Sequence, residues 1–167
     1  MRRGITQRAT RELLDFIRGK VENIALRTTL IVGYPTETDE DFQELYGFVK
    51  DMKFHRLGVF TYSHEEGTSA YELGDPIPEE VKEERKRIIM ELQQEISRDR
   101  NEQIVGTQVR ILLDRHEGEM AVGRTQWDAP EIDQEVFVRG VGMTGTGKFV
   151  KARVVDAVEY DLYAEVV

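Results

Sequence analysis

The spacing of apolar side chains changes along the chain, and each spacing predicts a different kind of element. Helical spacing, with an apolar residue at every third or fourth position, occurs over 6–18, 38–52 and 79–103. Runs of β-branched and apolar residues that are typical of strands lie between these helices, over 25–32 and 57–62. The succession of strand, helix and strand predicts a parallel βαβ crossover.

Beyond Gly106 the apolar period shortens to that of strands. Glycines and Asp/Pro clusters separate the predicted strands, which are 108–114, 119–124, 135–139, 149–157 and 161–166. Short strands at this density predict a small, closed or nearly closed antiparallel barrel of the OB type. We therefore predict an α/β segment over 1–101, followed by an all-β domain over 102–167.

Charge limits the partners that we expect for this chain. The sequence carries a net charge of -9, with 16 Lys and Arg against 20 Asp and Glu in 1–101 and 7 against 12 in 102–167. A barrel with this acidic excess argues against nucleic acid and favours a basic protein partner. No apolar run is long enough to span a bilayer, and no signal segment leads the chain, so we expect a cytoplasmic protein.

The absence of cysteine narrows the kinds of metal site that this sequence can form. The chain contains no cysteine, which excludes disulfides, thiolate zinc sites and cysteine-held iron–sulfur clusters within these residues. His64 stands next to Glu65 and Glu66, but no second ligand lies at metal-binding spacing. We therefore predict no metal site and interpret His64 as a surface-loop residue.

Two loops follow the predicted strands of the first segment. The first runs from Gly33 to Thr38 and the second from Tyr62 to Thr68. Because both come after parallel strands, we expect them to rim one pocket at the ligand side of the sheet. Two roles are open for Glu37. It accepts a hydrogen bond from a ligand, or it only completes a tight turn, where its carboxylate interacts favourably with the dipole of the following helix.

The barrel carries one further candidate surface. Trp127 is the only tryptophan, and it stands between Arg124 and acidic residues. An exposed Trp beside an Arg is typical of an interface, although the same residues also fit a turn that covers the barrel core. The four glycines between 140 and 147 fit a hairpin connection better than a phosphate-binding loop, because strands lie on both sides.

Taken together, several segments resemble the radical S-adenosylmethionine methylthiotransferase family. The matching segments are 1–4, 27–29, 31–38, 62–68 and 123–125. The resemblance covers essentially the whole chain. It implies that the first segment is the later portion of a partial (β/α) radical barrel, and that the second is a TRAM domain, a small barrel that docks the substrate macromolecule.

Within that family, two features resemble the branch that modifies a ribosomal protein. Glu65 and Glu66 stand where members that modify tRNA usually have an Arg-Pro pair, and 128–133 also resembles the ribosomal-protein branch. The resemblance implies transfer of a methylthio group to the β-carbon of an aspartate in the twelfth small-subunit ribosomal protein, a basic protein. Tyr34 and Thr36 depart from the usual Phe and Gly. A tRNA methylthiotransferase and a non-enzymatic TRAM docking module stay as alternatives.

The resemblance also implies cofactors and site residues. The parent enzyme would use S-adenosylmethionine and two 4Fe-4S clusters, so a cysteine-free chain is expected to be a piece of that enzyme and inactive alone. No catalytic residue is assigned. The residues expected near S-adenosylmethionine are Arg3, Thr29, Gly33, Tyr34, Pro35, Glu37, Tyr62 and Ser63. The residues expected to dock the substrate are Arg124, Trp127, Asp128 and Glu131. A partial barrel is also expected to self-associate through unpaired strand edges.

Overall fold

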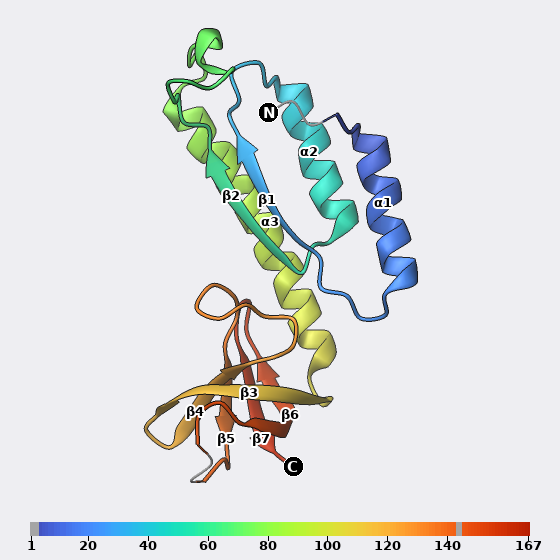
Figure 1. Ribbon diagram of the computed structural model, residues 1–167, viewed down its shortest axis with the longest axis vertical. Helices are drawn as coiled ribbons and strands as arrows, with labels where there is room; N and C mark the ends of the chain where they lie inside the picture. Colours follow the sequence, from blue (N-terminus) through green and yellow to red (C-terminus); the bar gives the residue numbers. More distant parts are fainter. Residues whose placement is uncertain (1–3, 143–144) are drawn as a thin grey trace. The chain divides into compact units, whose positions relative to one another are not determined.

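The structure is a computed structural model that describes residues 4–142 and 145–167 (Figure 1). Contacts divide the chain into two compact units, residues 1–93 and residues 94–167. The division falls inside one long helix, α3 (Glu79–Ile104), about two helical turns before the boundary that the sequence predicts. Each unit is described separately below.

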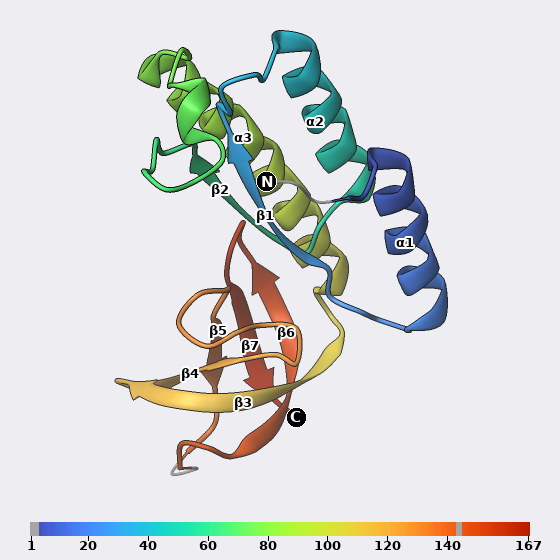
Figure 2. The same ribbon diagram turned by 45° about the horizontal axis from the view of Figure 1, so that its top comes forward.

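The first unit contains the predicted crossover. Its elements are α1 (Gln7–Lys20), β1 (Arg27–Val32), α2 (Asp39–Met52), β2 (Arg56–Thr61), the short 3-10 helix η1 (Tyr71–Leu73) and the beginning of α3. β1 and β2 are parallel, with Arg27 opposite Arg56 and Val32 opposite Thr61. Figures 1 and 2 show α2 and α3 running along this strand pair, with α1 beside α2.

The two faces of the β1–β2 pair differ sharply. Val32 and Val59 point to one face and are buried, as are Phe42 of α2 and Ile89 of α3, the two helices that run along the pair. On the other face Ile31 and Phe60 lie opposite each other in register and stay 43% and 63% exposed. Within the part of the chain that the structure describes, no third strand pairs with this sheet. One face of the pair, with two exposed apolar side chains near its carboxyl end, and two strand edges are therefore uncovered within the described residues.

An uncovered sheet of this kind promotes association. We expect the isolated chain to form dimers or larger species, and we expect Phe60→Lys to raise the monomer fraction because it places a charge in the apolar face. Light scattering over a concentration series measures this. Phe16→Lys is the matched control, since Phe16 is equally exposed (61%) but lies on α1. Equal behaviour of the two variants would place the association elsewhere.

The buried face of α3 agrees with the predicted stripe in part. Helical spacing predicts one apolar face through five positions, of which Arg85, Leu92 and Ile96 are buried. The other two differ, since Val81 is 38% exposed and Ile88 is only partly buried, whereas their neighbours Lys82 and Ile89 are buried. Burial of Lys82 is tolerable because its ammonium pairs with the carboxylate of Asp75.

The second unit is the predicted five-stranded closed barrel. Its strands are β3 (Gln108–Glu117), β4 (Met120–Arg124), β5 (Val136–Arg139), β6 (Phe149–Ala157) and β7 (Leu162–Val166). They close in the order β3-β4-β5-β7-β6, and β3 then pairs with β6. The core is formed by inward-facing apolar residues, among them Ile111, Leu113, Val136, Val138 and Leu162.

The barrel is not fully antiparallel, which corrects the prediction. β5 and β7 are parallel, with Val136 opposite Leu162, while the other neighbours are antiparallel. A closed ring with an odd number of strands cannot alternate direction at every step, so at least one pair must be parallel. The mixed pairing is thus a consequence of closing five strands.

Candidate functional site

The two predicted loops meet at the edge of the sheet where both parallel strands end. Tyr62 directly follows β2, and its N–H donates to the carbonyl of Val32 at the end of β1 over 2.8 Å. This contact brings the rings of Tyr34 and Tyr62 together, edge to face, with centroids 5.6 Å apart. The carboxyl ends of parallel strands are where α/β folds place their ligand sites. We call Gly33, Tyr34, Glu37 and Tyr62 the strand-end cluster.

The backbone position of Gly33 can be occupied only by glycine. Its φ is +77°, in the left-handed region that favours glycine. A Cβ placed there would lie 2.4 Å from Cγ of Lys82. The Gly33 N–H donates to Oε1 of Glu37 over 3.0 Å, which closes the turn. The loop is therefore packed tightly against α3.

Thr38 fixes the start of α2 after this turn. Its Oγ1 accepts from the Asp41 N–H over 3.1 Å, while the Asp41 carboxylate accepts from the Thr38 N–H over 2.9 Å, forming a capping box. The hydrogen bonds that the Thr38 N–H and the Thr38 hydroxyl donate to the Asp41 carboxylate lower the pKa of Asp41. Their stabilisation is therefore present above the ordinary pKa of an Asp and is lost as the pH falls through the lowered value.

Glu37 is held from within the unit by Arg85 of α3. The Arg85 guanidinium donates to Glu37 Oε1 over 2.6 Å and to Asp39 over 2.7 Å. The side chains of Arg85 and Glu37 are only 8% and 11% exposed. One oxygen, Oε1, takes the contacts from both Arg85 and Gly33, and Oε2 takes neither. Glu37 thus has a structural role whether or not it also contacts a ligand.

Lys82 lies under the same loop and is almost completely buried. Its Nζ is 2.6 Å from Asp75 and 3.2 Å from Glu79, and it donates to the carbonyl of Tyr62 over 3.4 Å. Burial alone would lower the pKa of Lys82, but the hydrogen bonds to Asp75 and Glu79 outweigh burial and raise it. Partial burial and the charge of Asp75 raise the pKa of Tyr62, so its phenol stays neutral.

The remaining residues predicted near a cofactor are placed unevenly. Thr29 lies on β1 opposite Gly58, on the uncovered face of the sheet, and Pro35 lies in the first loop. Ser63 donates from its Oγ to Glu65 over 2.6 Å. Arg3 lies outside the described residues.

His64 has the loop role that the sequence suggests. It stacks on Tyr71 with ring centroids 4.4 Å apart, and its Nε2 is 2.9 Å from the Tyr71 carbonyl. The residues that the structure describes contain no group of three or more His, Cys, Asp or Glu side chains arranged to hold a metal ion.

The predicted docking residues of the barrel separate into two pairs. Arg124 and Glu131 line one pocket of about 280 Å³, and Arg124 forms an ion pair with Asp114. Asp128 points inward, where it is buried and accepts hydrogen bonds from the hydroxyl and N–H of Thr125. The backbone N–H of Trp127 donates to Oγ1 of Thr125 over 3.2 Å, and Trp127 is partly buried.

The pocket beside Arg124 has an acidic lining. Its carboxylates are Asp114, Glu131, Asp133 and Glu135, and its cations are Arg115 and Arg124. Glu135 is bound by both terminal nitrogens of Arg115, at 2.6 and 2.7 Å, and this pairing lowers the pKa of Glu135. Ile132, between the carboxylates on the same loop, is 76% exposed. The surface combines negative charge with one exposed apolar side chain.

Lys82 and Arg85 are the functional-site residues that sequence reasoning missed. Both lie on α3, far along the chain from the loops that they support. The sequence does contain a signal for their role, because two cations three residues apart interrupt an apolar helical face, and buried cations require partners.

In residues 4–142 and 145–167, no helix has the length and the apolar composition of a membrane-spanning segment.

Comparisons with known proteins place both units. A model of the TRAM domain matches residues 105–167. The chain is 49% identical over 166 residues to a protein of Flavobacterium psychrophilum, 51% over 166 residues to one of Flavobacterium johnsoniae, and 48% over 165 residues to one of Aquifex aeolicus. All three are named ribosomal protein uS12 methylthiotransferase RimO. The matches cover 97–99% of this chain but 38% of each relative, so the chain spans well under half their length.

Proposed function

This chain belongs with the RimO-type methylthiotransferases and matches a TRAM-containing part of them, and on that premise we propose that it serves methylthio transfer to ribosomal protein uS12. The acceptor would be the β-carbon of an aspartate. The observation that carries the proposal is sequence identity of about one half along nearly the whole chain, loops and barrel included. We infer that the first unit supplies a wall of the reaction chamber and that the barrel docks the substrate.

The uncovered face of the β1–β2 pair supports the assignment of the first unit. Exposure of two large apolar side chains, Ile31 and Phe60, on one sheet face is unfavourable in water unless another element covers them. In a larger (β/α) barrel the same face would be closed by further strands. The strand-end cluster would then lie at the rim of the closed barrel, where such folds hold their ligands.

The strand-end cluster fits one of the two implied cofactors. The backbone at Gly33, the Tyr34–Tyr62 ring pair and Oε2 of Glu37 offer an apolar surface with polar atoms at its border, as an adenosyl group requires. When bound, S-adenosylmethionine supplies the methyl and radical chemistry of this family. Thr29, Pro35 and Ser63 would complete the contacts. The two 4Fe-4S clusters do not fit this chain, because no cysteine is present to ligate them.

The acidic pocket of the barrel fits a basic protein substrate. Four carboxylates against two arginines give it a negative potential, and a basic ribosomal protein would be attracted to it. Arg124 and Glu131 are the predicted docking residues that lie there. Trp127 stays a proposed contact, whereas the inward Asp128 would act by holding the loop in place.

Deleting the gene that encodes this chain tests the function. We expect mass spectrometry of uS12 from the deletion strain to show loss of about 46 Da, the difference between a hydrogen and an SCH₃ group. Expression of these 167 residues alone should not restore the modification, because the chain has no cysteine to hold a cluster. Persistence of the modified mass in the deletion strain would refute the proposal.

A further inference from the structure

One buried side chain of α3 contacts both loops of the candidate site. The stem of Lys82 lies against the first loop, where its Cγ and Cδ occupy the space that a Cβ on Gly33 would need. Its Nζ reaches the second loop, where it donates to the carbonyl of Tyr62 over 3.4 Å and lies 5.8 Å from the centre of the Tyr62 ring. Lys82 therefore joins the two loops that carry the strand-end cluster.

The same ammonium also contacts the far end of the connection between β2 and α3. We call this connection, residues 62–78, the β2–α3 segment. Figures 1 and 2 show it in green, at the end of the sheet to which both strands point. Nζ of Lys82 is 2.6 Å from the carboxylate of Asp75, while Tyr62 begins the segment. A single atom thus closes a loop whose ends are distant in the sequence, and closing a loop restricts its conformations.

Contacts inside the β2–α3 segment give it a shape but do not attach it to α3. The ring of His64 stacks on that of Tyr71, and the Gly74 N–H donates to the carbonyl of Tyr71 over 3.1 Å. These contacts join residues of the segment to each other. The Lys82 ammonium instead ties both ends of the segment to the helix, so we expect the order of the segment to depend on it.

The carboxylates around Lys82 tolerate the loss of their cation better than the buried Glu37 does. The side chains of Asp75 and Glu79 stay 30% and 61% exposed, so water can solvate both of them when the ammonium is removed. Methionine would keep the length of the stem, and an apolar side chain is favourable at a position that is 2% exposed. Stability and loop order can therefore be separated by substitution at this residue.

We propose that Lys82 is a positioning residue for S-adenosylmethionine, which fixes the β2–α3 segment against the first loop and so holds the strand-end cluster ready for the cofactor. This rests on the proposed function, which places the cofactor at that cluster. A segment that is fixed beforehand loses little freedom on binding, whereas a loose segment must first be ordered, which weakens affinity. Lys82 acts through Tyr62 and Gly33, and no contact with the cofactor is required of it.

Two measurements on the 167-residue chain test this: equilibrium dialysis with S-adenosylmethionine, and hydrogen exchange of backbone N–H groups. We expect Lys82→Met to speed exchange over 63–74 and to weaken binding about tenfold, while the unfolding midpoint stays close to that of the unsubstituted chain. Lys86→Met is the matched control. Lys86 lies about one helical turn further along α3, in an exposed ion pair with Glu83, so its loss should change none of these quantities.

Adding Asp75→Asn to Lys82→Met separates positioning from stability. The second substitution removes the carboxylate that has lost its cation, so any stability lost by Lys82→Met should return. Binding should stay weakened, because nothing restores the link between the two ends of the segment. If binding returns together with stability, or if exchange over 63–74 is unchanged in Lys82→Met, then Lys82 is only part of a buried ion pair and the proposal is overturned.

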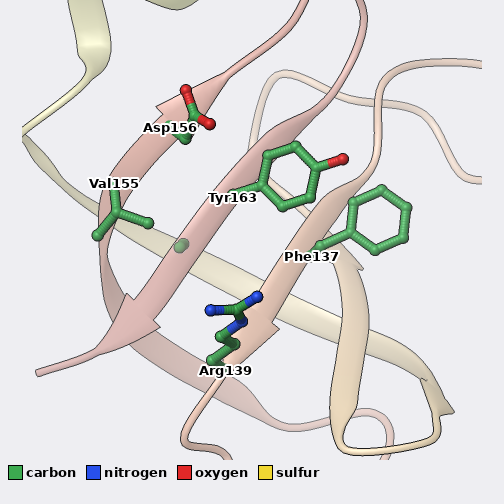
Figure 3. Close-up of a pocket in the computed structure, with 6 residues that line it drawn as sticks. Phe137, Arg139, Val155, Asp156 and Tyr163 are labelled. Carbon is green, nitrogen blue, oxygen red and sulfur yellow. The ribbon is translucent and has the colours of Figure 1, made fainter.

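Two ring substitutions distinguish failure of this proposal from failure of the cofactor assignment. Tyr62→Leu should weaken binding at least about tenfold, because the ring belongs to the cluster. Tyr163→Leu is its control and should leave binding unchanged. Figure 3 shows Tyr163 beside Phe137 on neighbouring strands of the barrel, where the two rings stack with centroids 5.4 Å apart.

The outcomes separate as follows. No binding by the unsubstituted chain, or no effect of Tyr62→Leu, would refute the place of the cofactor and this proposal with it. Weakening by Tyr62→Leu but not by Lys82→Met would refute the role of Lys82 alone. Neither result depends on the mass of uS12, which tests the proposed function.

Discussion

Arg85→Met is expected to destabilise the first unit by about 3 kcal/mol, because it leaves the buried carboxylate of Glu37 without its counter-ion. Methionine fills a similar volume and keeps the helix propensity, so the loss reports the charge interaction and not a cavity. Urea unfolding followed by circular dichroism measures it, since α1, α2 and most of α3 lie in this unit.

Arg87→Met is the matched control for this prediction. Arg87 also contacts two carboxylates, Glu84 and Glu91, on the same helix, but all three side chains are more than half exposed. Solvent screens such pairs, so the unfolding midpoint should not shift measurably. A shift as large as that of Arg85→Met would mean that burial does not decide the effect.

A double substitution separates the ion pair from other roles of Arg85. Glu37→Gln removes the stranded charge, and Arg85→Met combined with Glu37→Gln should therefore recover much of the stability lost by Arg85→Met alone. If the two losses simply add, Arg85 acts through Asp39 or through its contact with the Phe42 ring instead. The result decides whether α3 positions the loop that carries the strand-end cluster through Glu37.

The order of elements could be predicted from the sequence because apolar spacing is a local property. The runs 25–32 and 57–62 stand out by their β-branched residues, and the strands formed are Arg27–Val32 and Arg56–Thr61. The two loops that follow them could also be located, since parallel strands end at one edge. What local spacing could not supply was the burial of Lys82 on α3, which depends on where Asp75 places its carboxylate.

The candidate site was only half visible in the sequence. Gly33 and Glu37 were found because they lie in one turn, but the residues that hold them, Lys82 and Arg85, follow almost fifty positions later. The net negative charge of the barrel argues against nucleic acid, and this stays a prediction. Net charge does not show where charges meet, since only strand register brings Arg139 and Arg153 next to Glu165.

Gly123→Ala is expected to destabilise the barrel by about 3 kcal/mol, because β4 has no room for a side chain at this position. A Cβ there would lie 2.3 Å from the carbonyl oxygen of Leu112 and 2.8 Å from Cγ2 of Ile111. The first atom belongs to the backbone of β3, so relief requires the two strands to separate. Fluorescence of Trp127, the only tryptophan, reports unfolding of this unit directly.

Gly58→Ala provides the control, since Gly58 is also a strand glycine without a left-handed φ, but nothing lies within 4 Å of its Cβ position. It should stabilise the first unit by about 0.5 kcal/mol, through reduced freedom of the unfolded chain. If Gly123→Ala proved equally harmless, β3 and β4 would be less tightly joined than their pairing indicates. If it destabilises as expected, the glycine before Arg124 is required by close strand approach, and it fixes the position from which Arg124 reaches the acidic pocket.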